Sequence, residues 1–273
     1  MSHDEIKKIQ SDMEIQGFPL EVKTSEILEA HDWEVTNQAS YLDSETGKNR
    51  TLDIIAEKTV VLNSKWGFDI WICVECKKVT KPWVFYATDL DLTKEELRRK
   101  IVSSTHFSMN KLAYKRGKLD GFSNLVIGQF LLQNLYPQSI FKKLAHNSFE
   151  PFTEGKGLSI YTARMQVCNM ILYLEKSGVD ALSIIDSPYF LLYVPVIVVD
   201  GRLYVYEDGQ LNSIEGLYYH VPYYKSSFII EVVTAKSFEK YLNNLEQLIL
   251  KFKSARAMTD KFTVSQNQSM SQK

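Results

Sequence analysis

The chain has 273 residues, of which 45% are hydrophobic and 24% are charged, and its formal net charge is −1. This length can bury a full core as one or two domains, and the composition is that of an ordinary globular protein. The balanced charge excludes an overall basic field, so any surface for nucleic acid must be a local patch.

Targeting and membrane segments are not expected. The first residues are polar and charged, without the apolar core of a signal peptide. The longest apolar run, residues 189–199, contains Pro195 and is too short to cross a bilayer as a helix. The three cysteines have no evident partners, which is typical of a reducing compartment. We therefore expect a cytoplasmic protein that does not enter a membrane.

The first element of interest is a helix predicted over residues 17–30. Pro19 suits its first turn, where the missing N–H costs nothing. Glu21 lies in the same turn and shares a face with Ser25 and Leu28. We interpret Glu21 as an acid that faces the protein. The alternative is that it only complements the positive end of the helix dipole.

Two strands joined by a polar turn are predicted next, over residues 33–41 and 50–60. Asp53 lies in the second strand among apolar neighbours, although aspartate is unfavourable inside a strand. Taken singly, it would be interpreted as a solvent-facing residue. The strand that follows favours a functional interpretation.

That following strand, residues 71–78 with the sequence WICVECKK, is the one around which the chain is organised. Side chains alternate along a strand, so Glu75 and Lys77 stand on one face, about 6.6 Å apart. Burying a carboxylate and an ammonium is costly unless each is paired or bound to a metal. The pattern therefore points to a metal-dependent site.

The same strand contains a Cys-x-x-Cys motif, Cys73 and Cys76. No second Cys or His pair lies at ligand spacing, and a strand sends these two side chains to opposite faces. We interpret both as small buried side chains, not as a zinc or redox site.

Residues 88–157 are interpreted as a helical insertion that caps or flanks the site. An aromatic run at residues 83–86 precedes it and is assigned to the core or to the lip of a cleft. Within it, a charged helix is expected over residues 93–103 and another helix over 130–145. The insertion also holds a basic cluster that is a candidate for phosphate contacts, with a solvated loop as the alternative. Its members are Lys111, Lys115, Arg116 and Lys118.

The last third of the chain alternates helices and strands. We expect a helix over residues 158–176, a buried strand over 189–199 and a strand over 228–234. A closing amphipathic helix is expected over 237–252, and a disordered polar tail from 254. Asp200-Gly201 predicts a tight hairpin into residues 202–206, and Asp208-Gly209 predicts a second turn. Gln166 and Tyr173 share a helix face and are weaker candidates for approaching the site.

The order of a helix glutamate, a strand aspartate and Glu-x-Lys on the next strand resembles the PD-(D/E)-x-K nuclease superfamily. The resemblance covers residues 15–85, with Leu52 at the position of the superfamily's name-giving proline. It implies an α/β (mixed α+β) fold with a restriction-endonuclease-like core. That core is a mixed central sheet flanked by helices, to which this chain would add the insertion and an extra C-terminal β-hairpin. One domain would span residues 15–253, with its core in 15–85 and 158–253.

The resemblance also implies a Mg²⁺- or Mn²⁺-dependent nuclease that hydrolyses phosphodiester bonds, with DNA as the expected substrate. Asp53, Glu75 and Glu21 would be the metal ligands, joined by the backbone carbonyl of Cys76. Lys77 would orient or help to deprotonate the attacking water, or stabilise developing charge. A homodimer or a larger complex is the expected assembly, with nucleic acid as the partner.

Two alternatives to the nuclease stay open. One is a member of the same fold that binds nucleic acid or a protein partner and does not cut. The other is an assembly protein in which Asp53, Glu75 and Lys77 form only a structural ion pair.

Overall fold

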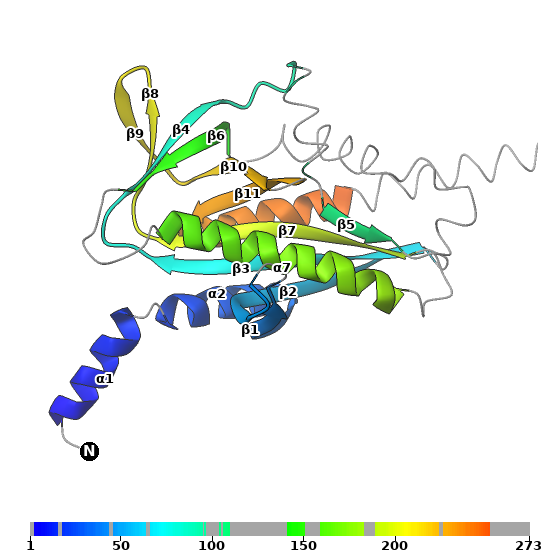
Figure 1. The fold of residues 1–273 in the computed structure, drawn as a ribbon, viewed down its shortest axis with the longest axis horizontal. Coiled ribbons are helices and arrows are strands. Elements are labelled where there is room, and N and C mark those ends of the chain that lie inside the picture. The colour runs from blue at the N-terminus through cyan, green and yellow to red at the C-terminus, as the bar shows by residue number, and fades with distance from the viewer. Residues whose placement is uncertain are drawn as a thin grey trace, which may run out of the picture.

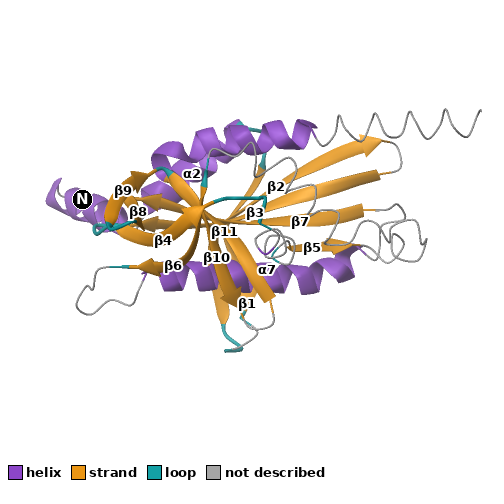
Figure 2. Cartoon of the chain, turned by 90° about the horizontal axis from the view of Figure 1, so that it is seen from above, coloured by secondary structure: helices purple, strands orange, loops and turns teal. Residues whose placement is uncertain are grey.

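The core of the protein is a large mixed sheet with helices on both faces (Figures 1 and 2). The structure is a computed structural model that describes residues 3–15, 18–43, 46–63, 66–94, 96, 104, 106–109, 141–150, 159–182, 189–223 and 226–251. This architecture confirms the expected mixed α/β class.

Helices frame the sheet at the two ends of the described chain and once in its middle. The helices are α1 (His3–Ile15), α2 (Phe18–Ala30) and α7 (Ser159–Leu182), followed by the 3₁₀ turn η2 (Ala235–Ser237) and a last helix over residues 238–251. The strands are β1 (Glu34–Leu42), β2 (Asn49–Asn63), β3 (Trp66–Lys78), β4 (Trp83–Asp89), β5 (His106–Met109), β6 (Lys143–Phe149), β7 (Tyr189–Asp200), β8 (Leu203–Glu207), β9 (Gln210–Ile214), β10 (Gly216–Tyr223) and β11 (Ser226–Thr234).

The strand order is β1-β2-β3-β7-β11-β10-β6-β4-β8-β9, and β5 pairs with β7 outside this path. β1, β2 and β3 are antiparallel neighbours, whereas β3, β7 and β11 run parallel to each other. Parallel central strands are covered on both faces, which explains the continuous apolar run in β7. The predicted helices and strands at residues 17–30, 33–41, 50–60, 71–78, 189–199 and 228–234 all match elements of the structure within a few residues.

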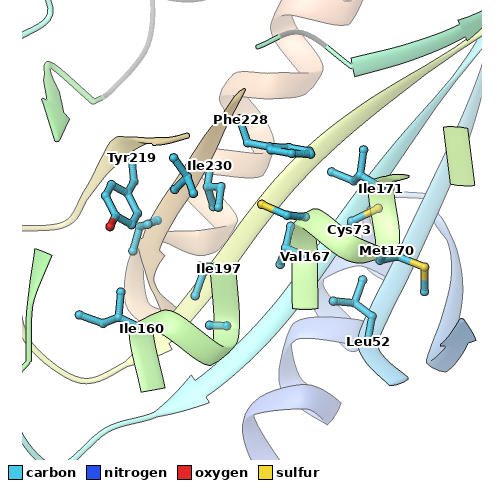
Figure 3. Packing of buried hydrophobic residues seen from close by; sticks show 14 of the residues in the cluster. Leu52, Cys73, Ile160, Val167, Met170, Ile171, Ile197, Tyr219, Phe228 and Ile230 are labelled. Carbon is cyan, nitrogen blue, oxygen red and sulfur yellow. The ribbon is translucent and has the colours of Figure 1, made fainter. Parts of the chain in front are cut away.

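The two faces of the sheet have separate cores. On one face, α7 packs over a core that includes Cys73, Val167 and Ile171 (Figure 3). On the other, α2 and the last helix cover a core that includes Cys76 and Leu28. Figure 2 shows α7 on one side of the strands and the other two helices opposite it. Cys73 and Cys76 are thus buried on opposite faces, as predicted. We call these the α7 core and the α2 core.

Part of the predicted helical insertion belongs to the sheet instead. Residues 143–149 form β6, so the helix expected over 130–145 is wrong at its C-terminal end. β6 pairs antiparallel with β4 and parallel with β10. These partners are remote in the sequence, and their backbone hydrogen bonds outweigh local helix preference. Trp83 and Phe85 of β4 are fully buried, which assigns the aromatic run to the core.

The hairpin expected at Asp200-Gly201 is also wrong. β8 pairs with β4 and β9, not with β7. The chain passes close to the end of β3 at this point, where a Cβ on residue 201 would lie 2.3 Å from Cγ2 of Val79, so glycine suits this position. The turn predicted at Asp208-Gly209 does join β8 to β9, and both residues have positive φ, 50° and 80°.

No helix in the described ranges is both long and apolar enough to cross a membrane.

Candidate functional site

Four side chains from three elements lie near each other where β2 and β3 pair, beside the start of α2. They are Glu21 of α2, Asp53 of β2, and Glu75 and Lys77 of β3. Each of the three carboxyl groups interacts electrostatically with Lys77, and Asp53 interacts with both glutamates. We call this group the four-residue site.

Glu75 and Lys77 form a direct ion pair. The Lys77 ammonium donates to Oε1 of Glu75. The Glu75 side chain is fully buried, whereas the Lys77 side chain is 23% exposed. The second oxygen of Glu75, Oε2, is buried and has no hydrogen-bond partner among the residues that the structure describes. A buried acceptor without a partner is unfavourable by about 1–3 kcal/mol, more if it is charged, so this oxygen is suited to a cation or a water.

Asp53 is held by the backbone of the neighbouring strand. The Cys76 N–H donates to Oδ2 of Asp53 over 2.7 Å. β2 pairs Ile54 with Val74, and continuing this register by one residue sets Asp53 opposite Glu75. Residues directly opposite each other on antiparallel strands have Cβ atoms about 5 Å apart. Pairing of β2 with β3 therefore brings the two acids together.

β2 changes sides of the sheet at Asp53. Leu52 packs into the α7 core, whereas Ile54, which simple alternation would place on the same face, packs into the α2 core. Asp53 sits at the crossing point and is partly exposed. At this position Asp53 interacts electrostatically with Glu21 on the α2 side of the sheet. It also interacts with Glu75, which shares a strand face with Cys73 of the α7 core.

Glu21 reaches the site because α2 lies close to the sheet. Two small buried hydroxyl residues, Thr24 and Ser25, form the contact face of the helix. The Thr24 hydroxyl donates to its own helix at the Leu20 carbonyl over 2.7 Å, and Ser25 Oγ donates to Oδ1 of Asn37 over 2.6 Å. Short side chains with satisfied hydroxyls permit this close approach without a buried unpaired donor.

Burial makes ionisation of all three acids less favourable. It raises the pKa of Glu75 to about 8, against the opposing effect of the Lys77 ammonium. It also raises the pKa of Asp53, although the Cys76 N–H and Lys77 partly offset the effect, and that of Glu21. Crowded acids whose pKa is raised in this way are typical of functional sites and also occur in structural ion pairs.

For Lys77, the interaction with Glu75 affects the pKa more than burial does. Burial alone lowers its pKa, but the Glu75 carboxylate and its hydrogen bond outweigh burial, so the pKa is raised overall. The group is therefore a persistent cation at neutral pH.

Several polar residues that the sequence did not single out surround the site. Gln38 Nε2 donates to Oε2 of Glu21 over 2.7 Å. Tyr41 is buried under α7, its hydroxyl has no partner within the described part of the chain, and burial raises its pKa to about 12. Both lie on β1, where the sequence pattern gives no reason to separate them from other strand residues.

The two α7 candidates reach different places. Gln166 Nε2 donates to the carbonyl of Thr51, two residues before Asp53, over 3.3 Å. Tyr173 contacts the ring of Tyr41, with centroids 6.4 Å apart, so it packs against β1. The basic candidates Lys111, Lys115, Arg116 and Lys118 lie outside the described residues.

The four-residue site does not form a ready three-ligand cluster. Across the described ranges, no three His, Cys, Asp or Glu side chains are grouped so that they could hold a metal ion. The chemistry of the donors nevertheless fits a hard divalent cation, because carboxylate oxygens are the ligands that Mg²⁺ prefers. The partnerless Oε2 of buried Glu75, beside Asp53, is the specific feature that fits such an ion.

No family model, no curated protein and no solved structure matches this chain.

Proposed function

We propose that the protein is a Mg²⁺-dependent nuclease with a restriction-endonuclease-like core, acting on DNA. The observation that supports the proposal is that Glu21, Asp53, Glu75 and Lys77 from three separate elements are near enough to shift one another's pKa, with a buried oxygen of Glu75 that lacks a partner among the described residues. DNA is the substrate that the resemblance to the PD-(D/E)-x-K superfamily implies.

Asp53 and Glu75 would hold the metal ion, with Glu21 contributing directly or through a water. The bound ion would neutralise charge on the scissile phosphate and make hydroxide available near neutral pH. The N–H of Cys76 orients Asp53 by its hydrogen bond to Oδ2, which leaves Oδ1 free of that contact. Burial of Glu75 excludes bulk water from one side of the site.

Lys77 would act as a donor and not as a base. Its pKa is raised, so it holds its proton at neutral pH and cannot accept one from water. A fixed ammonium beside the reacting phosphate can orient the attacking water and stabilise negative charge that develops in the transition state.

A second candidate is a protein of the same architecture that binds nucleic acid or a protein partner without cutting. The absence of a ready three-ligand group among the described residues and the net charge of −1 favour it. In that case the Glu75–Lys77 pair only satisfies two buried charges.

The test is cleavage of linear, circular and single-stranded DNA with Mg²⁺, Mn²⁺ or EDTA. We expect wild-type protein to cut only with the divalent ions, and Glu75→Ala and Lys77→Ala to reduce cutting to background. Circular dichroism spectra would show that both variants keep the fold.

Lys58→Ala is the matched control. Lys58 also lies in the sheet, is 28% exposed and forms an ion pair with Glu246, at 2.6 Å. It should cut at the wild-type rate. Normal cutting by Lys77→Ala would eliminate the mechanism, and metal-independent binding of DNA without cutting would support the second candidate.

A further inference from the structure

The β1–β2 ladder is interrupted at one residue pair. From Glu34↔Glu57 to Leu42↔Asn49 the register is constant, but Gln38 and Asp53 do not pair. No residue is inserted, because Ala39↔Leu52 and Asn37↔Ile54 lie in the same register. The interruption is therefore a local rotation of the chain and not a bulge with an extra residue.

Gln38 has the backbone conformation that produces this rotation. Its φ is 51°, in the left-handed region that residues with a Cβ rarely adopt. A residue held there is strained by about 1–2 kcal/mol. Glycine would relieve this strain, so the presence of glutamine needs a separate reason.

β1 changes sides of the sheet at Gln38, as β2 does at Asp53. Val35 packs against the α2 core, whereas Ala39 and Tyr41 belong to the α7 core, although all three have the same parity along the strand. Both strands therefore change sides of the sheet at the same level, which is that of Asp53 in the four-residue site.

The side chain of Gln38 supplies the reason. Its Nε2 donates to Oε2 of Glu21 over 2.7 Å, so one end of the carboxylate is fixed. Glu21 is the only one of the three acids that comes from a helix, and it has no backbone donor like that of Asp53 among the contacts described. Among the described contacts, the Gln38 amide is the side-chain donor to the Glu21 carboxylate.

We propose that Gln38 is a positioning residue that holds the Glu21 carboxylate on the side of Asp53, where Glu21 would support through a water a metal ion bound by Asp53 and Glu75. The proposal rests on the proposed function, because it concerns the same metal site. It explains both the strained backbone at residue 38 and the choice of glutamine there. Loss of an outer partner of a metal ligand typically weakens metal binding by about 10- to 100-fold.

The experiment is calorimetric titration of the full chain with Mn²⁺, alongside thermal melting without metal. Gln38→Gly keeps the left-handed backbone and removes only the amide. We expect it to melt at or above the wild-type temperature and to bind Mn²⁺ about 10-fold or more weakly. Ser40→Gly, at an exposed position of the same strand, should leave the affinity unchanged.

Gln38→Asn is a second variant, because asparagine tolerates the left-handed region but its amide is shorter by one methylene. It should weaken binding as well. If Gln38→Gly and Gln38→Asn both bind Mn²⁺ within twofold of wild type while Asp53→Asn does not bind, the positioning role is wrong and the metal site stands. If wild-type protein takes up no Mn²⁺, both the positioning role and the proposed function are wrong.

Discussion

Two glutamates in central strands are buried to nearly the same degree, but only one lies in the candidate site. Glu75 of β3 is fully buried and Glu231 of β11 is 5% exposed. Burial raises the pKa of Glu75 to about 8 and that of Glu231 to about 7. By burial and acidity alone the two residues are equivalent.

Their neighbours differ. Glu231 lies on the face of the α2 core, where the side chain of Tyr241 from the last helix lowers its pKa and partly offsets the effect of burial. Glu75 has a lysine in direct contact and two further acids close enough to influence it. A buried acid alone is thus a weak sign of function, whereas several buried charges from separate elements are a stronger one. The two glutamates can be compared directly by matched glutamine variants.

The largest expected difference is in metal binding. Glu75→Gln should bind Mn²⁺ at least about 100-fold more weakly than wild type and lose cleavage. Even loss of a residue that hydrogen-bonds to a metal ligand weakens metal binding by about 10- to 100-fold. Glu231→Gln should bind and cut as wild type does. Calorimetry and a cleavage assay on both variants measure this, and equal metal affinity in the two would mean that Glu75 is not a ligand.

The next expected difference is in the pH dependence of stability. Burial raises the pKa of Glu231 from 4.5 to about 7, so the folded protein holds this proton more tightly than the unfolded chain does. Its contribution to stability is full below about pH 4.5 and is lost as the pH rises to 7 and beyond. Glu231→Gln should therefore be more stable than wild type at pH 8, by on the order of 3 kcal/mol at about 1.4 kcal/mol per pKa unit.

Urea unfolding at pH 5 and pH 8 measures this gain, which should be small at pH 5. Glu75→Gln should gain less at pH 8, because the substitution also leaves the Lys77 ammonium without its carboxylate. An equal gain in stability at both pH values for Glu231→Gln would contradict a raised pKa for Glu231.

A smaller effect is expected on the pH dependence of metal affinity. A ligand must lose its proton to bind a cation, and the pKa of Glu75 is raised to about 8. Mn²⁺ affinity should therefore rise by about tenfold per pH unit below pH 8 and level off above it. Titrations from pH 6 to pH 9 measure the slope. Glu231→Gln should show the same slope as wild type, whereas a flat profile would exclude proton loss from Glu75.

The smallest effect concerns the Tyr241 hydroxyl beside Glu231. This hydroxyl lowers the pKa of Glu231 against the effect of burial, so it stabilises the charged form of the acid. Tyr241→Phe should lower the free energy of unfolding by about 1–2 kcal/mol at pH 8 and by less at pH 5. Mn²⁺ affinity should not change, and a change would mean that the two regions are coupled.

Local patterns were sufficient for much of the fold and for the relative placement of Glu75 and Lys77. Pro19 and Glu21 in the first turn predicted α2, and strict alternation in β3 predicted that Cys73 and Cys76 would face opposite cores. The same alternation placed Glu75 and Lys77 on one face, and the structure shows their ion pair. These features depend on neighbours within a few residues, which a sequence displays directly.

Local patterns failed where pairing is between remote segments. β6 lies where a helix was expected, and β8 pairs with β4 instead of folding back on β7. Glu231 carries the same local signal as Asp53, an acid in an apolar strand, yet nothing in the strand itself distinguishes the two. Their difference comes from the residues that other elements bring to them.

The sequence by itself determined most of the helices and strands, and that one strand places a carboxylate beside an ammonium, because side-chain direction follows from backbone period. Only the tertiary structure decided that Asp53 sits where β1 and β2 change sides between the two cores, and that the Gln38 amide hydrogen-bonds to Glu21. The physical reason is that these contacts join segments that are remote in the sequence, the left-handed residue Gln38 on β1 and the packed helix α2. A periodic sequence pattern describes only residues close to each other along the chain.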